Sequence, residues 1–218
     1  MGKWIHVDKQ TISFKCRHVD KLRIKYKKEG DGFQYDAICA DRYKFSVYFR
    51  NVASPQQLID KGICPLHARV VSLFKQFPSH NYVCIMDNLY TSSKLALYAI
   101  NCELKVYIHG VTRQSSIGIP KYIEKTAHTR KDNIMRHTRT LKLEKLVGEP
   151  TMKYLVALSL YDVKPFYFIK NAWTDIRWIK KHRDVWSSYL QRMIKRPYYI
   201  LNVIDIYNHN MNNVDISN

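Results

Sequence analysis

Apolar residues recur along the chain with periods that predict an alternation of strands and helices. Residues 33–40 and 43–50 are rich in aromatic and aliphatic side chains, which predicts two strands joined by a tight turn at Asp41. A short extended piece at 11–14 precedes them. In the second strand one set of alternate positions is apolar throughout, as expected of a strand with two different faces: Tyr43, Phe45, Val47 and Phe49.

Two helices are predicted between these strands and the middle of the chain. Pro65 opens a segment whose apolar residues follow the 3.6-residue period until Pro78 stops it. Residues 94–100 form the second predicted helix, behind a cluster of hydroxyl residues that can cap it. Further apolar runs predict strands at 104–110, 154–160 and 166–169, and the last helix begins at Tyr199. This order predicts an α/β fold with a mixed sheet.

One predicted strand ends at an acid. Residues 82–86 are mostly apolar, Asp87 follows them, and the hydroxyl-capped helix comes next. In an open α/β sheet, ligands bind at the carboxyl ends of the strands, so Asp87 is a candidate site residue. The alternative is structural, because an Asp in this position can also cap a helix or make an Asx turn with Asn88.

The chain carries a large positive charge. Among its 218 residues, 36 Lys and Arg face 18 Asp and Glu, which gives a formal net charge of +18 and a pI of about 9.7. Such an excess predicts a polyanionic partner, nucleic acid first and an acidic membrane surface second. No apolar window reaches the length of a membrane span, and we expect no membrane partner.

Positive charge is concentrated in residues 113–145, where nine bases face three acids. A segment of this kind suits contacts to phosphates rather than to base edges. A merely solvated basic face has the same composition, and the sequence leaves that alternative open. The candidate DNA-binding residues here are Arg113, Lys121, Lys125, Arg130, Lys131, Arg136 and Arg139.

Three tryptophans lie among Lys and Arg residues in the segment 171–197. They are Trp173, Trp178 and Trp186. Tryptophan rings interleaved with bases can stack on nucleotides, but tryptophan is more often largely buried. The sequence leaves both interpretations open.

The five cysteines are spaced singly, without any Cys-x-x-Cys pair, so the sequence does not support a zinc site. The chain start has no apolar segment typical of a signal peptide. Both observations favour reduced thiols in the cytosol or the nucleus.

Three acids occupy positions from which they could meet in the fold: Asp41 at the predicted hairpin, Asp87 at a strand end, and Asp215 on the last helix. Asp215 continues an apolar helical stripe, where a carboxylate needs a cation as partner. Clustered carboxylates repel one another unless a divalent cation neutralises them, and oxygen ligands select Mg²⁺ or Mn²⁺. Asp41, Asp87 and Asp215 are therefore the predicted catalytic and metal-binding residues, suited to phosphodiester displacement.

Several motifs resemble the piggyBac family of transposases, over nearly the whole chain. The motifs are Asp87-Asn-Leu-Tyr-Thr-Ser, His109-Gly-Val-Thr-Arg113, Gly118-Ile-Pro120, the ending Tyr207-Asn-His-Asn-Met211-Asn-Asn-Val-Asp215, and the lead-in Ile12-Ser-Phe-Lys-Cys-Arg17. The resemblance implies an RNase H-like domain over residues 1–218, flanked by helices, with a basic insertion at about 113–197. It also implies a Mg²⁺-dependent site of three aspartates that nicks transposon ends, transfers strands and favours TTAA targets. In that comparison Asp87 resembles the second acid and Asp215 the third.

The chain departs from the family pattern at the first acid. It reads Cys39-Ala40-Asp41-Arg42, where the strict register puts Ala40 at the catalytic position and a one-residue slip puts Asp41 there. The family's N-terminal region and cysteine-rich C-terminal module are also missing, and we expect a fragment. The expected function is a nuclear DNA transposase domain, for which a homodimer is compatible with the resemblance. The alternatives are a non-catalytic DNA-binding remnant of a transposable element and a basic protein with weak, salt-labile binding only.

Overall fold

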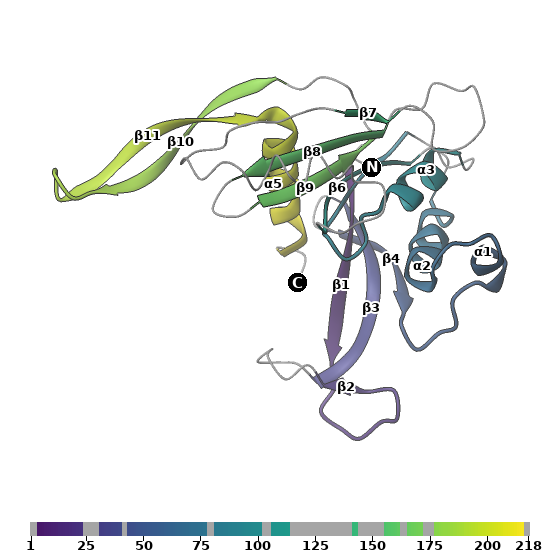
Figure 1. The fold of residues 1–218 in the computed structure, drawn as a ribbon. Helices are drawn as coiled ribbons and strands as arrows, with labels where there is room; N and C mark the ends of the chain where they lie inside the picture. The colour runs from purple at the N-terminus through teal and green to yellow at the C-terminus, as the bar shows by residue number, and fades with distance from the viewer. Residues whose placement is uncertain are drawn as a thin grey trace.

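A computed structural model describes residues 4–23, 31–40, 43–77, 81–101, 106–113, 141–143, 155–161, 165–171 and 177–215. Figure 1 shows how their strands and helices are arranged. The strands are β1 (Trp4–Ser13), β2 (Leu22–Arg23), β3 (Asp31–Ala40), β4 (Tyr43–Phe49), β5 (Val83–Met86), β6 (Tyr107–Thr112), β7 (Leu141–Leu143), β8 (Leu155–Tyr161), β9 (Pro165–Lys170), β10 (Trp178–Ser187) and β11 (Arg192–Leu201). The helices are α1 (Gln56–Asp60), α2 (Pro65–Phe74), α3 (Ser93–Asn101) and α5 (Asn202–Asp215).

A mixed sheet is the centre of the fold, as the sequence predicts. Its nine strands follow the order β2-β3-β1-β5-β6-β9-β8-β7, and β4 pairs with β3 outside this path. β1, β5 and β6 are parallel to one another, whereas β3 is antiparallel to β1 and β9 is antiparallel to β6. The carboxyl end of β5 therefore lies beside the middle of β1, where Val7 is opposite Met86 and β1 continues to Ser13.

Helices cover both faces of this sheet. The larger core lies between the sheet and α1–α3, where Val7, Ile38 and Met86 pack with Phe74 and Leu95. On the other face α5 packs against β1 and β5. Burial of these apolar side chains is the main favourable contribution to folding, at about 25 cal/mol per Å² of buried apolar surface.

Local sequence explains where the two central helices begin. Pro65 occupies the first turn of α2, a position where its missing N–H costs nothing. α3 begins behind Ser92, whose Oγ accepts a hydrogen bond from the backbone N–H of Leu95 at 3.1 Å. This is the hydroxyl cap that the sequence predicts.

The first strand is much longer than the sequence predicts. Only residues 11–14 were expected to be extended, but β1 begins at Trp4 and lies at the centre of the sheet, between β3 and β5. His6, Asp8 and Gln10 interrupt its apolar pattern because they all lie on the face beneath α5 or beside it. The position of β1 decides which acids can meet.

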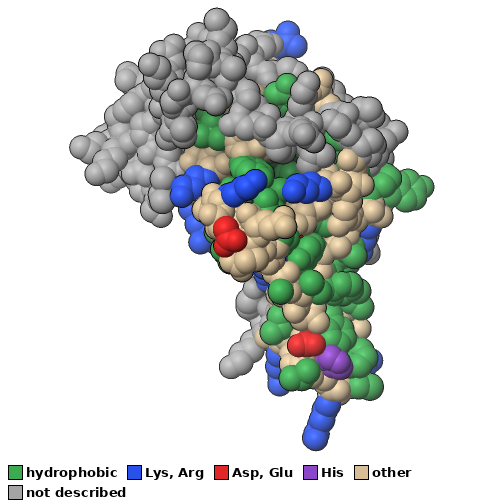
Figure 2. All heavy atoms as spheres, turned by 90° about the vertical axis from the view of Figure 1, so that its right-hand side faces the viewer, with side chains coloured by type: hydrophobic (Ala, Val, Ile, Leu, Met, Phe, Trp, Pro, Cys, Tyr) green, Lys and Arg blue, Asp and Glu red, His purple; other side chains and the backbone are tan. Residues whose placement is uncertain are grey.

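The exposed side of β4 is its apolar side. Phe45 and Val47 are 47% and 42% exposed, whereas Ser46 is buried and hydrogen-bonds Gln76, which follows the end of α2. A period of two predicts a strand but does not predict which of its faces is buried. Figure 2 shows apolar side chains continuing down the narrow lower part of the molecule, where Figure 1 places the lower ends of β1–β4.

Part of the expected insertion belongs to the central sheet. β8 and β9 lie within residues 113–197, yet β9 pairs with β6 and β8 pairs with β9. The rest of that range includes β10 and β11, which pair only with each other as a two-stranded ribbon. Figure 1 shows this ribbon extending away from the sheet.

Within the described residues, no helix combines the length and the apolar character needed to cross a membrane.

Candidate active site

Asp87 follows β5 and begins a tight turn. Its Oδ1 accepts a hydrogen bond from the backbone N–H of Leu89 at 2.9 Å, which confirms the Asx turn. Thr91 fixes the other side of the turn, because its hydroxyl and its N–H both donate to the carbonyl oxygen of Asp87, at 2.7 and 3.1 Å. A carboxylate has about four lone-pair sites, so the Asx turn still allows Asp87 to bind a cation.

A second acid lies beside Asp87, and it is Asp8 rather than Asp41. In the parallel pairing of β1 with β5, Val7 is opposite Met86, so Asp8 and Asp87 are the next residues on two strands about 4.8 Å apart. Asp8 follows His6 by two residues, as Asp87 follows Ile85, so both acids lie on the face of the sheet that α5 covers. Both are partly exposed.

Tyr207 of α5 lies close to both acids. Burial raises the pKa of its phenol, and the charges of Asp87 and Asp8 raise it further. Its ring stacks on His109, with centroids 6.1 Å apart, and meets the ring of Phe168 edge-on. His109 in turn donates from Nε2 to the carbonyl oxygen of Val203, at 2.8 Å, and so ties β6 to the start of α5.

Opposing effects set the ionisation of Asp87. Partial burial raises the pKa of its carboxyl above the ordinary value. Hydrogen bonds from the N–H groups of Leu89 and Tyr90, and the positive charges of Arg113 and Arg50, act in the opposite direction. Arg113 is exposed at the end of β6, so the structure brings one predicted DNA-binding residue close to Asp87.

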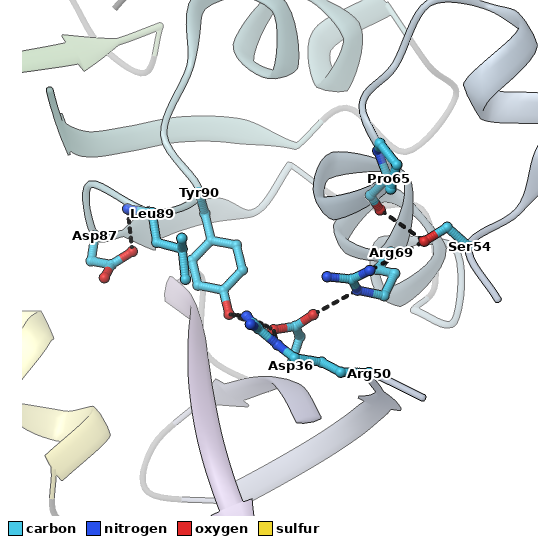
Figure 3. A network of polar contacts seen from close by, with 8 residues as sticks. All are labelled: Asp36, Arg50, Ser54, Pro65, Arg69, Asp87, Leu89 and Tyr90. Carbon is cyan, nitrogen blue, oxygen red and sulfur yellow. Dashed lines mark hydrogen bonds and ion pairs between the residues drawn. The ribbon is translucent and has the colours of Figure 1, made fainter. Parts of the chain in front are cut away.

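A buried ionic cluster lies next to this turn (Figure 3). Asp36 of β3 is fully buried, and its carboxylate contacts Arg50 at 2.7 Å and Arg69 at 2.9 Å. The hydroxyl of Tyr90 donates to the same carboxylate at 2.6 Å. Because Tyr90 belongs to the turn that Asp87 begins, the cluster anchors this turn to the far side of the sheet.

The strand before Asp41 ends far from Asp87. Asp41 lies outside the described residues, but β3 is antiparallel to β1 and Cys39 is opposite His6, so β3 ends toward the amino ends of β1 and β5. A meeting of Asp41 with Asp87 would require 33–40 to lie beside the strand of Asp87, but β1 separates the two strands. Ala40 is buried in the apolar core beneath the helices, away from both acids.

The structure describes the other predicted residues in part. The backbone of Asp215 lies in the last turn of α5, two helical repeats of four residues beyond Tyr207, and its side chain lies outside the described residues. The predicted DNA-binding residues other than Arg113 also lie outside the described part of the chain: Lys121, Lys125, Arg130, Lys131, Arg136 and Arg139.

The oxygen ligands fit a hard divalent cation. Asp8 and Asp87 bring two carboxylates together at one sheet edge, and α5 brings the backbone of a third aspartate toward the same face. Mg²⁺ and Mn²⁺ prefer such ligands. Among the described side chains, no cluster of three or more His, Cys, Asp or Glu residues could hold a metal by itself. Two carboxylates alone do not fill the coordination sphere of such a cation, so a metal here would need further oxygen ligands.

A separate pocket of about 240 Å³ lies between the start of α2 and the start of α3. It contains His67 and Ser92, whose Nδ1 and Oγ are 3.5 Å apart. Burial lowers the pKa of His67. Ser92 already accepts the capping hydrogen bond of α3, so this pair is a helix cap rather than an activated nucleophile.

Comparison with known proteins identifies the family and supports the fold. The model of the family described as Transposase IS4 matches residues 1–218. Among solved structures, a piggyBac transposase in a synaptic complex with hairpin DNA is similar with a TM-score of 0.70 and 18% sequence identity. The match covers 98% of this chain and 39% of that one, so the two share the fold over a portion of the longer protein. No curated protein matches the chain.

Proposed function

The chain belongs to the Transposase IS4 family, and we propose that it forms the catalytic portion of a DNA transposase, cutting and rejoining phosphodiester bonds. One observation supports this most directly: Asp8 and Asp87 follow adjacent positions of two neighbouring parallel strands, beneath α5. Sequence reasoning missed Asp8. In the proposal it replaces Asp41 as the first acid, with Asp87 second and Asp215 third.

Each residue has a distinct role in this proposal. Asp8, Asp87 and Asp215 would hold Mg²⁺ or Mn²⁺, which in such sites activates water and stabilises the charge of the reacting phosphate. Arg113 would bind the DNA backbone close to the acids, because it is exposed and its charge reaches Asp87. Arg113 and Arg50 also favour the ionised form of Asp87, the form that a metal needs.

The proposed substrate is DNA, in agreement with the net charge of +18. The similar piggyBac structure contains hairpin DNA, and this supports the same class of substrate here. Action at transposon ends, a homodimer and a nuclear location stay predictions.

Metal binding tests the assignment of the first acid. We expect calorimetric titration with Mn²⁺ to show binding by the folded wild type, and loss of detectable binding in Asp8→Asn and in Asp87→Asn. Asp41→Asn should bind as the wild type does. Asp60→Asn is a matched control, because Asp60 is exposed on α1.

The outcomes separate three interpretations. Loss of binding in Asp41→Asn with retention in Asp8→Asn would restore Asp41 as the first acid. No binding by the folded wild type would show that the acids do not form a metal site, and would leave a non-catalytic DNA-binding remnant. Where binding is found, nicking of a supercoiled plasmid with Mn²⁺ should depend on the same two aspartates.

A further inference from the structure

The β10–β11 ribbon has two chemically different faces. Alternate residues of a strand share a face, and residues directly opposite in an antiparallel pair share it too. The register places Lys180 opposite Tyr199, Trp186 opposite Met193 and Asp184 opposite Lys195. The aromatic face of the ribbon therefore consists of Trp178, Lys180, His182, Asp184, Trp186, Met193, Lys195, Pro197, Tyr199 and, at the root, the buried Leu201.

The large side chains of the aromatic face are exposed. Trp178, Trp186 and Tyr199 are 46%, 56% and 58% exposed, and Met193 is 56% exposed. Tryptophan is largely buried on average in proteins, so two half-exposed rings on one surface of a single chain need a partner. The opposite face is less accessible, since Ile179, Val185 and Ile194 are only partly exposed.

The root of the ribbon is fixed to the domain by the opposite face. Lys181 forms an ion pair of 2.8 Å with Asp205 in the first turns of α5. Ile200 is buried among residues of β8, β9 and α5. The guanidinium of Arg183 lies 5.5 Å from the centre of the Tyr198 ring. On the aromatic face only Leu201, at the root, is buried in the same cluster, and the large side chains from Trp178 outward are exposed.

The positive charge of the ribbon favours a polyanion as its binding partner. Residues 178–201 contain six Lys and Arg but one acid, Asp184. Lys180 and Lys195 lie on the aromatic face itself, between the two tryptophans. Trp178 and Trp186 are eight residues apart on one strand, or about 26 Å at 3.3 Å per residue. The face thus presents aromatic rings at its two ends and lysines between them.

We propose that the aromatic face binds single-stranded DNA, with unpaired bases stacking on Trp178 and Trp186 and phosphates contacting Lys180 and Lys195. Surfaces for unpaired nucleic acid combine these features, because every base has a face on which an aromatic ring can stack. A two-stranded ribbon can also enter the major groove of duplex DNA. Reading that groove requires polar groups aimed at base edges, whereas the large exposed apolar side chains of this face, Trp178, Trp186, Met193 and Tyr199, offer none that could read a base edge in a specific way except the Tyr hydroxyl and the indole N–H groups.

The proposal extends the proposed function and rests on it in taking DNA to be the polyanion. Cutting a strand creates ends at which nucleotides can unpair. The ribbon joins the helix of Tyr207 at its root and extends away from the sheet, so its aromatic face would hold unpaired nucleotides of a strand that leads away from the acids. Binding to this surface does not require a metal, so the two proposals can fail separately.

Fluorescence anisotropy with a labelled (dT)12 oligonucleotide, in EDTA, tests the proposal. We expect (dT)12 to bind more tightly than a 12-base-pair duplex. Trp186→Leu keeps an apolar side chain but removes the ring, and should weaken binding of (dT)12 about tenfold, as loss of one stacked base does. Trp186→Phe should recover most of that affinity.

Neighbouring lysine and arginine residues provide a matched pair. Lys195→Gln and Arg196→Gln each remove one positive charge at adjacent positions of β11, but only Lys195 lies on the aromatic face. Lys195→Gln should weaken (dT)12 binding several-fold more than Arg196→Gln does. Equal losses, an unchanged affinity in Trp186→Leu, or tighter binding of the duplex or of (U)12 RNA would overturn the proposal.

Two further variants separate this proposal from the catalytic one. Asp87→Asn should bind (dT)12 as the wild type does, and Trp186→Leu should keep the wild-type affinity for Mn²⁺. Circular dichroism confirms that both variants are folded. If the (dT)12 measurements fail while Mn²⁺ binding is as expected, the proposal for the ribbon is wrong and the proposal for the metal site stands.

Discussion

At the scale of single residues, Asp36 is the most constrained side chain near the site. Its carboxylate is fully buried and contacts two guanidiniums and the hydroxyl of Tyr90. These partners come from the residue after β4, from α2 and from the Asp87 turn. A buried carboxylate with two positive partners is stable only while all of them are present, because each remaining charge would otherwise be buried without compensation.

Replacing Asp36 should therefore destabilise the whole domain. Asp36→Asn leaves Arg50 and Arg69 without their shared anion, and we expect the free energy of unfolding in urea to fall by about 3 kcal/mol. Asp60→Asn, on the exposed side of α1, should change it by less than about 0.5 kcal/mol. A similar loss in both variants would show that the cluster contributes no more than a surface charge.

His109 should make stability sensitive to acid. Burial, with the charge of Lys170, lowers the pKa of His109 from 6.5 to about 4, and its Nδ1 has no hydrogen-bond partner among the described residues. Between pH 6.5 and 4 the unfolded chain takes up a proton that the folded chain does not. Stability should fall across this window, by up to about 3 kcal/mol, and then level off as far as His109 is concerned.

Urea unfolding from pH 7 to pH 4.5 checks this expectation. His109→Gln removes the titrating group but keeps an N–H able to reach the carbonyl oxygen of Val203. Its stability should therefore fall less over the same range than that of the wild type. Parallel profiles of the two proteins would show that another group is responsible for the acid sensitivity.

The residue that sequence reasoning missed, Asp8, left a recognisable signal. Ile5-His-Val7 leads into Asp8, as Cys84-Ile-Met86 leads into Asp87, so a short mostly apolar run ends at an acid twice. The polar residues His6 and Gln10 interrupt the apolar pattern by which a strand is recognised in a sequence. They lie on the face of the sheet that carries the site, and not on the face that packs into the apolar core. Asp41 was the better candidate for the first acid in the sequence, because the apolar pattern of 33–40 predicts a strand more clearly. A sequence does not show in which direction that strand runs within the sheet.

At the scale of elements, a close approach between β5, β6 and the Asp87 turn positions the site. Gly110 of β6 is opposite Met86 of β5, and a Cβ atom at Gly110 would collide with Thr91 Oγ1 and the carbonyl oxygen of Met86. Thr91 is the residue that fixes the backbone of Asp87. Only glycine leaves room for its hydroxyl at this point.

Gly110→Ala should displace Thr91 and, with it, Asp87. We expect a lower stability and at least a tenfold loss of Mn²⁺ affinity by calorimetry. Gly62→Ala is a suitable control, because Gly62 has a φ of 78° in open space at the loop before α2. It should lose about 1 kcal/mol of stability through backbone strain and keep the affinity for Mn²⁺. Equal Mn²⁺ affinity in both variants would contradict the role given to Gly110.

The two central helices and most strands of the central sheet were predicted from the sequence. The helix α1, the β10–β11 ribbon and the pairing of the strands were not predicted, and the last helix begins at Asn202 rather than at Tyr199. The predicted helices after Pro65 and after Ser93 are confirmed as α2 and α3, and the strand at 33–40 is confirmed as β3. These elements depend on local periods and caps. Pairing between distant strands depends on packing of the whole sheet, which is why neither the central position of β1 nor the outward face of β4 was predicted.

At the scale of the whole molecule, the expected insertion is not one separate unit. β8 and β9 extend the central sheet next to β6, and within the described residues the β10–β11 ribbon is the part of 113–197 that stands outside it. The basic composition of this range predicted a nucleic-acid partner, but it did not distinguish strands that build the core from strands that leave it. Trp178 and Trp186 proved to be surface residues, the less common of the two alternatives.

The ribbon and the last helix meet without an intervening loop. Leu201 is the last residue of β11 and Asn202 the first of α5, and the ion pair between Lys181 and Asp205 braces this junction. A force on the outer end of the ribbon would therefore act as a torque on α5, the helix that carries Tyr207 beside Asp8 and Asp87.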